Sequence, residues 1–271
     1  MLEETYVLWY REMRKWLGRK SVVVISLFSP IFWILLFGKS FNPLNLLPQG
    51  LGEATELLRA RIIELFGTQD YFTYVAAGMA VAFALFQASF AGASALFDRR
   101  LGYMDRLLVT PIRRESIFAA KVLASVTRVV VLTAFLLAVS YIAGLQLKAD
   151  FTPLDLFLAL LTIAFISLTL TSIFMLAGFV MDNPEGLFAI GNLVNTPLLF
   201  ASSVLFPTTQ MPAWLRLVAE VNPLSHGASL VRYLLVGKPM EDPYLVLALF
   251  GIVSVTVFAI SAKVAVRLME R

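Results

Sequence analysis

Few residues in this chain could do covalent chemistry. It has no cysteine, so disulfides, thiolate metal sites and cysteine nucleophiles are excluded, and its single histidine, His226, disfavours a histidine metal cluster. Ser225 directly precedes His226, but adjacent residues rarely bring a nucleophile and its base into productive geometry, and no third orienting group accompanies them. We therefore expect His226 to cap or pack a helix, and we expect neither a catalytic residue nor a metal site.

Gly38-Lys39-Ser40 resembles the end of a phosphate-binding loop. That motif also requires a glycine at the position of Trp33 and a strand before it, whereas an apolar helix is predicted here. The string is therefore no nucleotide site. Any use of ATP requires a different polypeptide, and we expect ATP and Mg²⁺ to be held there, with no cofactor in this chain.

One charged residue, Arg128, falls in the middle of a long apolar run. A centred arginine costs about 2.5–3.5 kcal/mol on membrane-insertion scales, so it either faces the interior of a helix bundle or snorkels to the inner headgroups. The apolar runs otherwise hold almost no Asp, Glu or His. Because proton- and ion-coupled carriers place such groups within their spans, this scarcity disfavours that class.

A polar stripe with helical spacing follows one face of the apolar run 187–206. A polar stripe on a membrane helix must face protein or water, so it either lines a translocation path or forms hydrogen bonds between helices. Pro197 interrupts the same helix. The stripe comprises Asn192, Asn195, Thr196 and Leu199, continued by Ser202 and Ser203. An aromatic and amide surface from the run 72–97 is predicted to face it, formed by Phe83, Phe86, Gln87 and Phe90.

These elements belong to a strongly apolar chain. Hydrophobic residues make up 59% of its 271 residues, charged residues 15%, and the mean hydropathy is +0.81. A soluble domain holds roughly 45–50% apolar and 25% charged residues, so the composition predicts an all-α integral membrane protein. Six runs approach the roughly 20 residues that a bilayer requires. They are 22–38, 72–97, 117–143, 153–180, 187–206 and 244–266.

Basic residues predict the orientation. Fourteen Lys and Arg fall on the face that holds both termini, against seven on the opposite face. Because basic clusters stay on the cytoplasmic side, both termini are predicted to be cytosolic. The net charge of only +4 gives no indication of nucleic-acid binding.

The N-terminal segment 1–20 is predicted to be an interfacial helix. Tyr6, Trp9, Tyr10, Met13, Trp16 and Leu17 form an apolar stripe, with the cations Arg11, Arg14 and Lys15 largely off it. Such a helix lies on the inner leaflet, with tryptophans at headgroup depth and arginines near anionic lipid. The alternative is a basic anchor that serves only to set the topology.

The segment 98–116 between the second and third spans is too long and too basic for a simple connector. Leu101, Met104 and Leu108 recur at helical spacing with charges between them, which predicts an amphipathic cytosolic helix. Thr110-Pro111 then predicts the start of a new helix. On the opposite face, the apolar and proline-punctuated segment 207–243 predicts short re-entrant helices, because irregular backbone at membrane depth must be shielded by protein or water.

Three strings stand in this order: LWYREMRKWLGRK, FDRRLGYMDRLLVTPIRRESI and VNPLSHGASLVRYLLVG. With the predicted topology, they resemble the permease subunit of a type-2 ABC transporter over nearly the whole chain. The likeness is greatest to the daunorubicin-resistance and lipo-oligosaccharide export branch. One departure is Ala120, where that family often has glycine.

The resemblance implies that 1–20 is a connecting helix and 98–110 a coupling helix that docks in a groove of a separate ATPase. It also implies that Asn222, Pro223 and Leu224 lie near an outer gate, and that two permeases and two ATPase subunits form the working unit. The implied coupling residues are Asp98, Arg99, Arg100, Leu101, Met104, Arg106, Leu107 and Leu108. The interfacial residues predicted from the N-terminal stripe and its cations are Trp9, Arg11, Arg14 and Trp16.

The resulting expectation is a permease of the plasma membrane. It would export an amphipathic drug, lipid or glycolipid-like molecule through a central cavity, together with a second copy of itself and the ATPase. The alternatives are a stand-alone channel or secondary carrier, and an intramembrane hydrolase.

Overall fold

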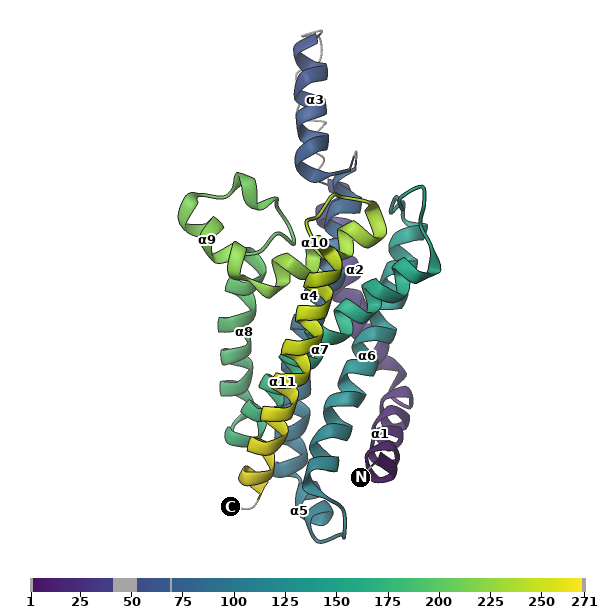
Figure 1. Cartoon of the computed structure of the whole chain (residues 1–271). Helices are drawn as coiled ribbons and strands as arrows, with labels where there is room; N and C mark the ends of the chain where they lie inside the picture. Colours follow the sequence, from purple (N-terminus) through teal and green to yellow (C-terminus); the bar gives the residue numbers. More distant parts are fainter. Residues whose placement is uncertain (1, 41–52, 69, 270–271) are drawn as a thin grey trace.

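The computed structural model describes residues 2–40, 53–68 and 70–269, and within them all regular secondary structure is helical. This confirms the all-α prediction. Figure 1 shows the arrangement. The elements are α1 (Leu2–Leu17), α2 (Lys20–Ser40), α3 (Glu53–Phe66), α4 (Tyr71–Arg100), α5 (Tyr103–Leu108), α6 (Arg114–Ile142), α7 (Pro153–Val180), α8 (Pro184–Phe200), η2 (Thr208–Gln210), α9 (Ala213–Val221), α10 (Pro223–Val236) and α11 (Pro243–Met269).

Four helices of the described chain are long and apolar enough to cross a membrane by length and composition: the one containing α4, and α6, α7 and α11. In α2 the corresponding apolar stretch is shorter, Val23–Leu36, and α8 has only 17 residues. The count of six spans therefore stays a prediction. The run expected over 187–206 ends early as a helix, at Phe200, and continues as irregular backbone.

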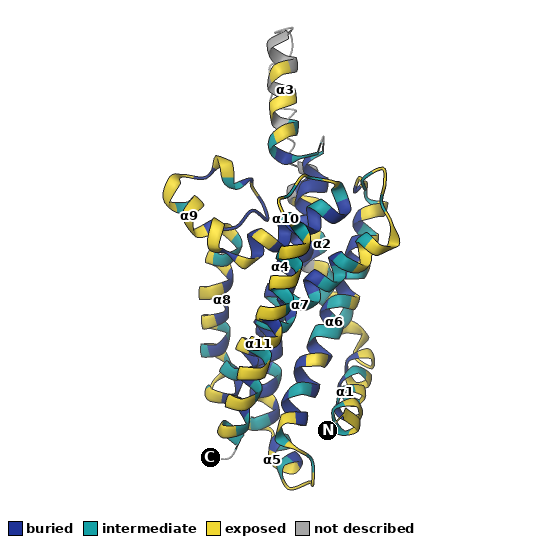
Figure 2. Ribbon diagram, in the orientation of Figure 1, coloured by how far each residue is buried: buried dark blue, intermediate teal, exposed yellow. Residues whose placement is uncertain are grey.

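Helix α4 lies at the centre of the bundle and is buried at every residue from 71 to 85 (Figure 2). Its small residues allow neighbouring helices to approach closely. Helix α7 approaches α4 closely at Gly92 and Gly178, where a Cβ on either glycine would overlap backbone of the opposite helix. The small residues of α4 therefore determine where α7 crosses it.

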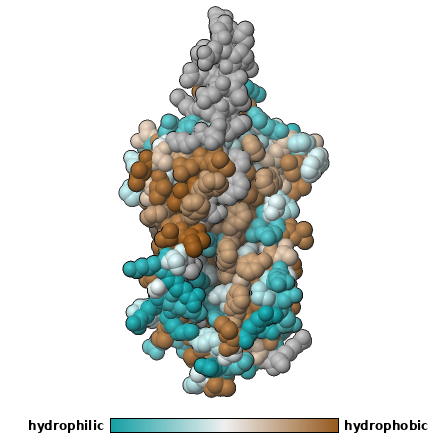
Figure 3. Space-filling view, turned by 180° about the vertical axis from the view of Figure 1, so that it is seen from behind, coloured by the Kyte–Doolittle hydropathy of each residue, from teal (hydrophilic) through white to brown (hydrophobic). Residues whose placement is uncertain are grey.

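Helix α11 lies on the outside of the bundle. Its apolar side chains Ile252, Val253, Val255 and Ile260 are exposed, and Ser254 is among its few buried residues. A helix that exposes apolar side chains all along its length is suited to contact lipid. In Figure 3, which shows the molecule from behind, hydrophobic side chains form a band above the hydrophilic ones of the lower end.

The bundle has two ends that differ in chemistry. Helix α1 begins, and α11 ends, at the end that carries α5, which we call the α5 end (Figure 1). The opposite end carries α9 and α10, and we call it the α10 end. Local signals define several boundaries: Thr152 and Asp155 form a capping box before α7, Asn183 caps α8, and Asn222 caps α10.

Candidate functional site

The predicted coupling helix is two elements. Helix α4 continues to Arg100, and α5 begins only at Tyr103, after Gly102 in the left-handed conformation (φ 65°). Because an unstrained left-handed residue interrupts the helix there, the single amphipathic helix expected over 98–110 was wrong. The apolar stripe was wrong for the same reason, since Leu101 lies in the turn and is 77% exposed.

Two residues of α5 face the bundle. Met104 and Leu107 are buried, so neither offers its side chain to a partner in this conformation. They belong to an apolar cluster that joins the α5 ends of five helices. Its other buried members are Leu8 of α1, Ala91 and Ala95 of α4, Ile117, Phe118, Ala120 and Val122 of α6, Met175 and Phe179 of α7, and Ala265 of α11.

The outward face of the same segment is open. Leu101, Asp105, Arg106 and Val109 are exposed, Val109 to 86% of its surface, and we call these four residues the outer face of α5. Leu108 beside them is half-buried. Leu101 and Arg106 belong to the predicted coupling set, whereas Asp105 and Val109 were missed. Had the helix been placed after Gly102, the i, i+3 spacing of Met104 and Leu107 would have indicated its buried side and left Asp105 and Val109 on the other.

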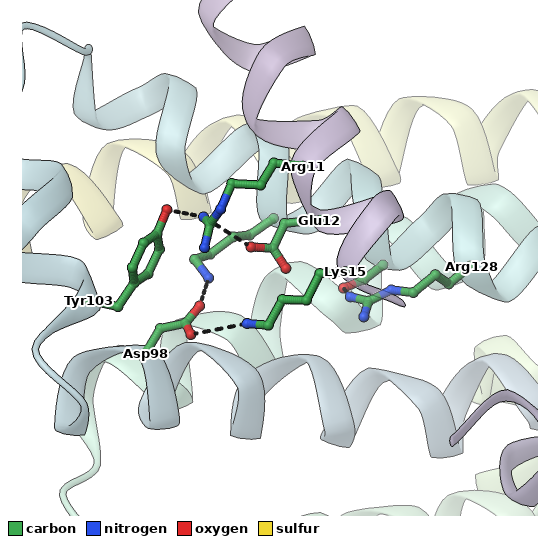
Figure 4. A network of polar contacts seen from close by, with 8 residues as sticks. Arg11, Glu12, Lys15, Asp98, Tyr103 and Arg128 are labelled. Carbon is green, nitrogen blue, oxygen red and sulfur yellow. Dashed lines mark hydrogen bonds and ion pairs between the residues drawn. The ribbon is translucent and has the colours of Figure 1, made fainter. Parts of the chain in front are cut away.

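Asp98, a predicted coupling residue, is buried in the last turn of α4. One carboxylate oxygen accepts a hydrogen bond from the ammonium group of Lys121 in α6, which is also buried, and the other lies 3.7 Å from that of Lys15 in α1. Asp98 therefore joins three helices (Figure 4) and does not present its carboxylate at the surface.

Arg99 closes the end of α7. Its guanidinium donates hydrogen bonds to the carbonyl oxygens of Phe179 and Met181, the latter at 3.2 Å, and lies 3.6 Å from the Asp182 carboxylate. A cation near the last carbonyls of a helix is favourable. Arg99 thus has an internal role, while Arg100 beside it is exposed.

A pocket of about 390 Å³ opens beside α5. Apolar side chains from four helices line it, with charges of both signs among them. The lining residues are Leu96, Arg99 and Arg100 of α4, Met104, Asp105 and Leu108 of α5, Phe179 and Asp182 at the end of α7, and Leu268 and Met269 of α11. Among the described residues, no group of three or more His, Asp or Glu could hold a metal ion.

Helix α1 packs against the bundle through a face that includes only part of the predicted stripe, namely Trp9, Met13 and Trp16. Leu8, Glu12 and Trp16 are its buried residues, and the indole of Trp9 donates a hydrogen bond to the Thr127 hydroxyl at 3.1 Å. Tyr6, Tyr10 and Leu17, predicted to lie on the same stripe, remain exposed with the cation Arg14.

Polar contacts hold α1 at Glu4, in its first turn, and at Arg11, near its middle. The carboxylate of Glu4 accepts hydrogen bonds from the Ser116 hydroxyl (2.8 Å) and the Arg113 amide (3.2 Å), which lower its pKa. Arg11 donates to the Tyr103 hydroxyl, and its guanidinium carbon lies 4.0 Å from the centre of that ring. Helix α1 is therefore connected directly to α5 and α6.

Arg128 lies near these polar contacts of α1. Its guanidinium turns back along α6 and donates hydrogen bonds to the Ala124 carbonyl at 3.2 Å and the Ser125 hydroxyl at 2.8 Å. Figure 4 shows it on the α1 side of α6, beside Glu12 and Lys15. Arg128 is therefore directed toward the α5 end and α1.

The residues predicted to line a path divide into two groups. Phe83 and Asn195 are buried, and the Asn195 amide donates a hydrogen bond to the Ser89 hydroxyl at 2.9 Å, so these two pack α4 against its neighbours. Phe90, Asn192 and Thr196 are exposed. The remaining predicted residues, Phe86, Gln87 and Leu199, are half-buried.

At the α10 end lies a site that the sequence did not indicate. Arg232 of α10 is the largest side chain in the described residues that is fully buried. Its Nε donates to the Tyr74 carbonyl at 3.1 Å and its Nη2 to the Val204 carbonyl at 2.8 Å. The Val204 carbonyl, in irregular backbone, thus gains a partner that secondary structure does not supply, and the Tyr74 carbonyl, which lies within α4, gains a second donor.

The irregular segment 201–206 is held by further side chains. The hydroxyls of Tyr71 and Tyr74 donate to the carbonyls of Leu205 (3.0 Å) and Ser203 (2.8 Å). The Asn222 amide donates to the carbonyls of Leu198 and Ala201, both at 2.7 Å. Side chains thus replace the missing helical hydrogen bonds. Of the predicted outer-gate residues, Asn222 and Leu224 are buried and Pro223 is exposed.

Residues 3–236 match the ABC-2 type transporter family. Among curated proteins, the chain is 27% identical to the putative transport permease ycf38 of Porphyra purpurea, over 80% of this chain and 68% of that protein. It is 28% identical to the daunorubicin resistance ABC transporter permease protein DrrB1 of Streptomyces coeruleorubidus, over 63% and 59% of the two chains. It is 29% identical to nodulation protein J of Rhizobium leguminosarum bv. trifolii, over 71% of each.

Proposed function

Since this chain belongs to the ABC-2 type transporter family, we propose that it is the membrane-spanning permease subunit of an ATP-driven exporter. In this proposal a separate ATPase subunit holds ATP and Mg²⁺ and hydrolyses the nucleotide. Two permeases and two ATPase subunits form the working unit in the plasma membrane. The α5 end faces the cytosol, because most of the basic residues that flank the apolar helices lie there.

The observation that carries the proposal is the two-sided character of α5. Met104 and Leu107 anchor it in the cluster that joins five helices, while its outer face stays open. A force applied to Leu101 or Val109 therefore reaches the ends of the long helices through close-packed side chains, which transmit strain. An outer face that is open to a partner, on a helix anchored in the bundle, supports docking of an ATPase at α5.

The substrate in this proposal is an amphipathic drug, lipid or glycolipid-like molecule. Its path follows the exposed face of α8 with Asn192 and Thr196, together with Phe90 of α4, where two copies of the chain meet. Exposed polar groups on a membrane helix require protein or water beside them, which supports this placement. Asn222 and Leu224 then belong to the outer gate, held closed by the side-chain contacts to the segment 201–206.

Lipid is the further partner of α1. Its exposed Tyr6, Tyr10 and Leu17 lie along the helix with Arg14, and aromatic and basic residues together suit the headgroup region of an anionic leaflet. Of the predicted interfacial set, Trp9 instead donates a hydrogen bond to Thr127 of α6, and Trp16 is buried.

The test is reconstitution in liposomes with and without the partner ATPase. We expect the permease alone to release no phosphate from ATP and the assembled complex to couple hydrolysis to substrate export. Hydrolysis by the lone chain would contradict the proposal. Substrate movement by the lone chain along an ion gradient would instead support a secondary carrier.

A further inference from the structure

Asp98, Lys15 and Lys121 bring three helices together at one point. Asp98 and Lys121 are 5% and 6% exposed, so their ion pair is removed from solvent, whereas the Lys15 side chain is 37% exposed. The two lysines approach different oxygens of the carboxylate. One carboxylate thus links the end of α4 to the beginning of α6 and to α1.

This link lies next to α5. Asp98 is in the last turn of α4, and Tyr103, the first residue of α5, receives the hydrogen bond from Arg11. Figure 4 shows both contacts on the same side of α1, one helical turn apart, at Arg11 and Lys15. Helix α1 is therefore held to the two segments that flank the turn at Gly102.

We propose that Asp98 is a positioning residue for transport, which makes α1 move with α5. The proposal rests on the proposed function. When the ATPase displaces the outer face of α5, the shared carboxylate passes the displacement to α1 through Lys15 and to α6 through Lys121. Asp98 therefore acts inside the permease and does not dock the ATPase.

The competing explanation is that the ion pair only holds the helices together. The two explanations predict different results for a variant in which both charges are replaced by apolar groups. A buried ion pair replaced by well-packed apolar residues commonly retains stability, whereas removal of one partner leaves an uncompensated charge. A structural role survives this replacement, but a link through Lys15 does not.

The experiment compares the complex with ATPase in liposomes for Asp98→Asn, Lys15→Met and the double variant Asp98→Leu/Lys121→Met. Arg19→Met is the matched control, since it removes one exposed cation close to Lys15. The readouts are thermal unfolding, co-purification of the ATPase, and substrate molecules exported per ATP hydrolysed. We expect normal co-purification in every variant and about a five- to tenfold lower export per ATP in all but the control.

The outcomes separate the explanations. Wild-type export per ATP in Lys15→Met, or its recovery in the double variant, overturns the proposal. If the double variant does not fold, Lys15→Met alone decides, because its partly exposed site tolerates methionine. Absence of ATPase from the wild-type complex would contradict the proposed function and leave no role for Asp98.

A second measurement monitors the motion itself. The chain has no cysteine, so single cysteines at Arg14 of α1 and Arg106 of α5, both exposed, can carry a pair of spin labels. We expect the distance between the labels to stay constant when a non-hydrolysable ATP analogue binds the complex, and to change in Asp98→Asn. A change in the wild type would show that α1 does not move with α5 and would overturn the proposal.

Discussion

The guanidinium of Arg232 lies over the ring of Tyr74, with 3.6 Å between the guanidinium carbon and the ring centre, and donates a hydrogen bond to the carbonyl of the same residue. Gly78, one turn further along α4, makes this approach possible, because a Cβ there would overlap both Arg232 and the Val204 carbonyl. The arginine therefore joins α10, α4 and the irregular segment 201–206.

Replacement of Arg232 by methionine should destabilise the protein. The Val204 carbonyl would lose its partner, and a buried unsatisfied group costs about 1–3 kcal/mol, whereas the Tyr74 carbonyl would lose only the second of its two donors. Removal of the buried charge offsets part of this, so we expect a net loss of about 2 kcal/mol. Arg232→Lys should destabilise the protein by nearly as much, because an ammonium group cannot reproduce the two-pronged donor geometry of the guanidinium. Thermal unfolding in detergent measures both.

Gly78→Ala is the matched variant, since it disturbs the same contact from the other side. If the contact is one unit, the double variant Arg232→Met/Gly78→Ala should be less destabilised than the sum of the two single effects. Strict additivity would mean that the two residues contribute independently.

Lys238 should make stability depend on pH. Burial and the nearby Arg232 charge lower its pKa from 10.5 to about 8, although its ammonium donates a hydrogen bond to the Leu65 carbonyl at 2.8 Å. Between these two values the folded chain binds fewer protons than the unfolded chain, so stability should rise with pH across this window. The measurement is the unfolding midpoint from about pH 7.5 to 10. Lys238→Met should flatten this rise, and an equal rise in both proteins would contradict the assignment.

Substitutions on the outer face of α5 should weaken docking of the ATPase, whereas substitutions on its buried side should weaken folding. Val109→Asp should weaken ATPase association at least about tenfold, because burial of a valine contributes about 1.5–3 kcal/mol, and it should leave folding intact at this exposed position. Met104→Ala should instead destabilise the permease by about 2–4 kcal/mol, since it opens a cavity in the shared cluster. Co-purification and thermal unfolding distinguish the two.

One result would contradict docking on the outer face of α5. Loss of the ATPase from Met104→Ala at temperatures where that variant is folded, together with retention by Val109→Asp, would place docking on the buried side of α5. Thr110, beside Val109, offers the control substitution Thr110→Ser, which keeps the hydroxyl that donates to the Leu107 carbonyl.

The sequence predicted the bounds of a helix correctly where the local signals agree. Helix α7 has the predicted bounds of 153–180, because Pro153 and the capping residue Thr152 begin it and an unbroken apolar run comes after them. At α5 the apolar spacing suggested one long helix, but Gly102 divides it, so Leu101 is exposed while Met104 and Leu107 face the bundle. A pattern based on period alone cannot show such a break.

The contacts at the α10 end could not be predicted from local sequence patterns, for a different reason. The carbonyls of 201–206 find their donors on Tyr71, Tyr74, Asn222 and Arg232, all far away in the sequence. In the sequence, Arg232 is one of the seven basic residues placed on the face opposite the termini, and nothing there marks it as buried. Its burial depends on the small residue Gly78 in a different helix, and that pairing is a property of the packed bundle.

The last prediction separates two neighbours on α8. Asn195 is 3% exposed and donates to the Ser89 hydroxyl, so Asn195→Leu should cost about 1 kcal/mol of stability, and Ser89→Ala should have a similar effect that is not additive with it. Thr196 is exposed one residue further on. Thr196→Val keeps the shape of the side chain and removes the hydroxyl, so it should leave unfolding unchanged while altering substrate-stimulated ATP hydrolysis several-fold.

The measurements are thermal unfolding of the permease and ATP hydrolysis by the complex across a substrate titration. Leu193→Val, at another exposed position of the same helix, controls for a general effect of changing its surface. An unchanged response to substrate in Thr196→Val and in Asn192→Leu would show that the polar face of α8 only joins helices, because a path that carries an amphipathic molecule must respond to the loss of its polar groups.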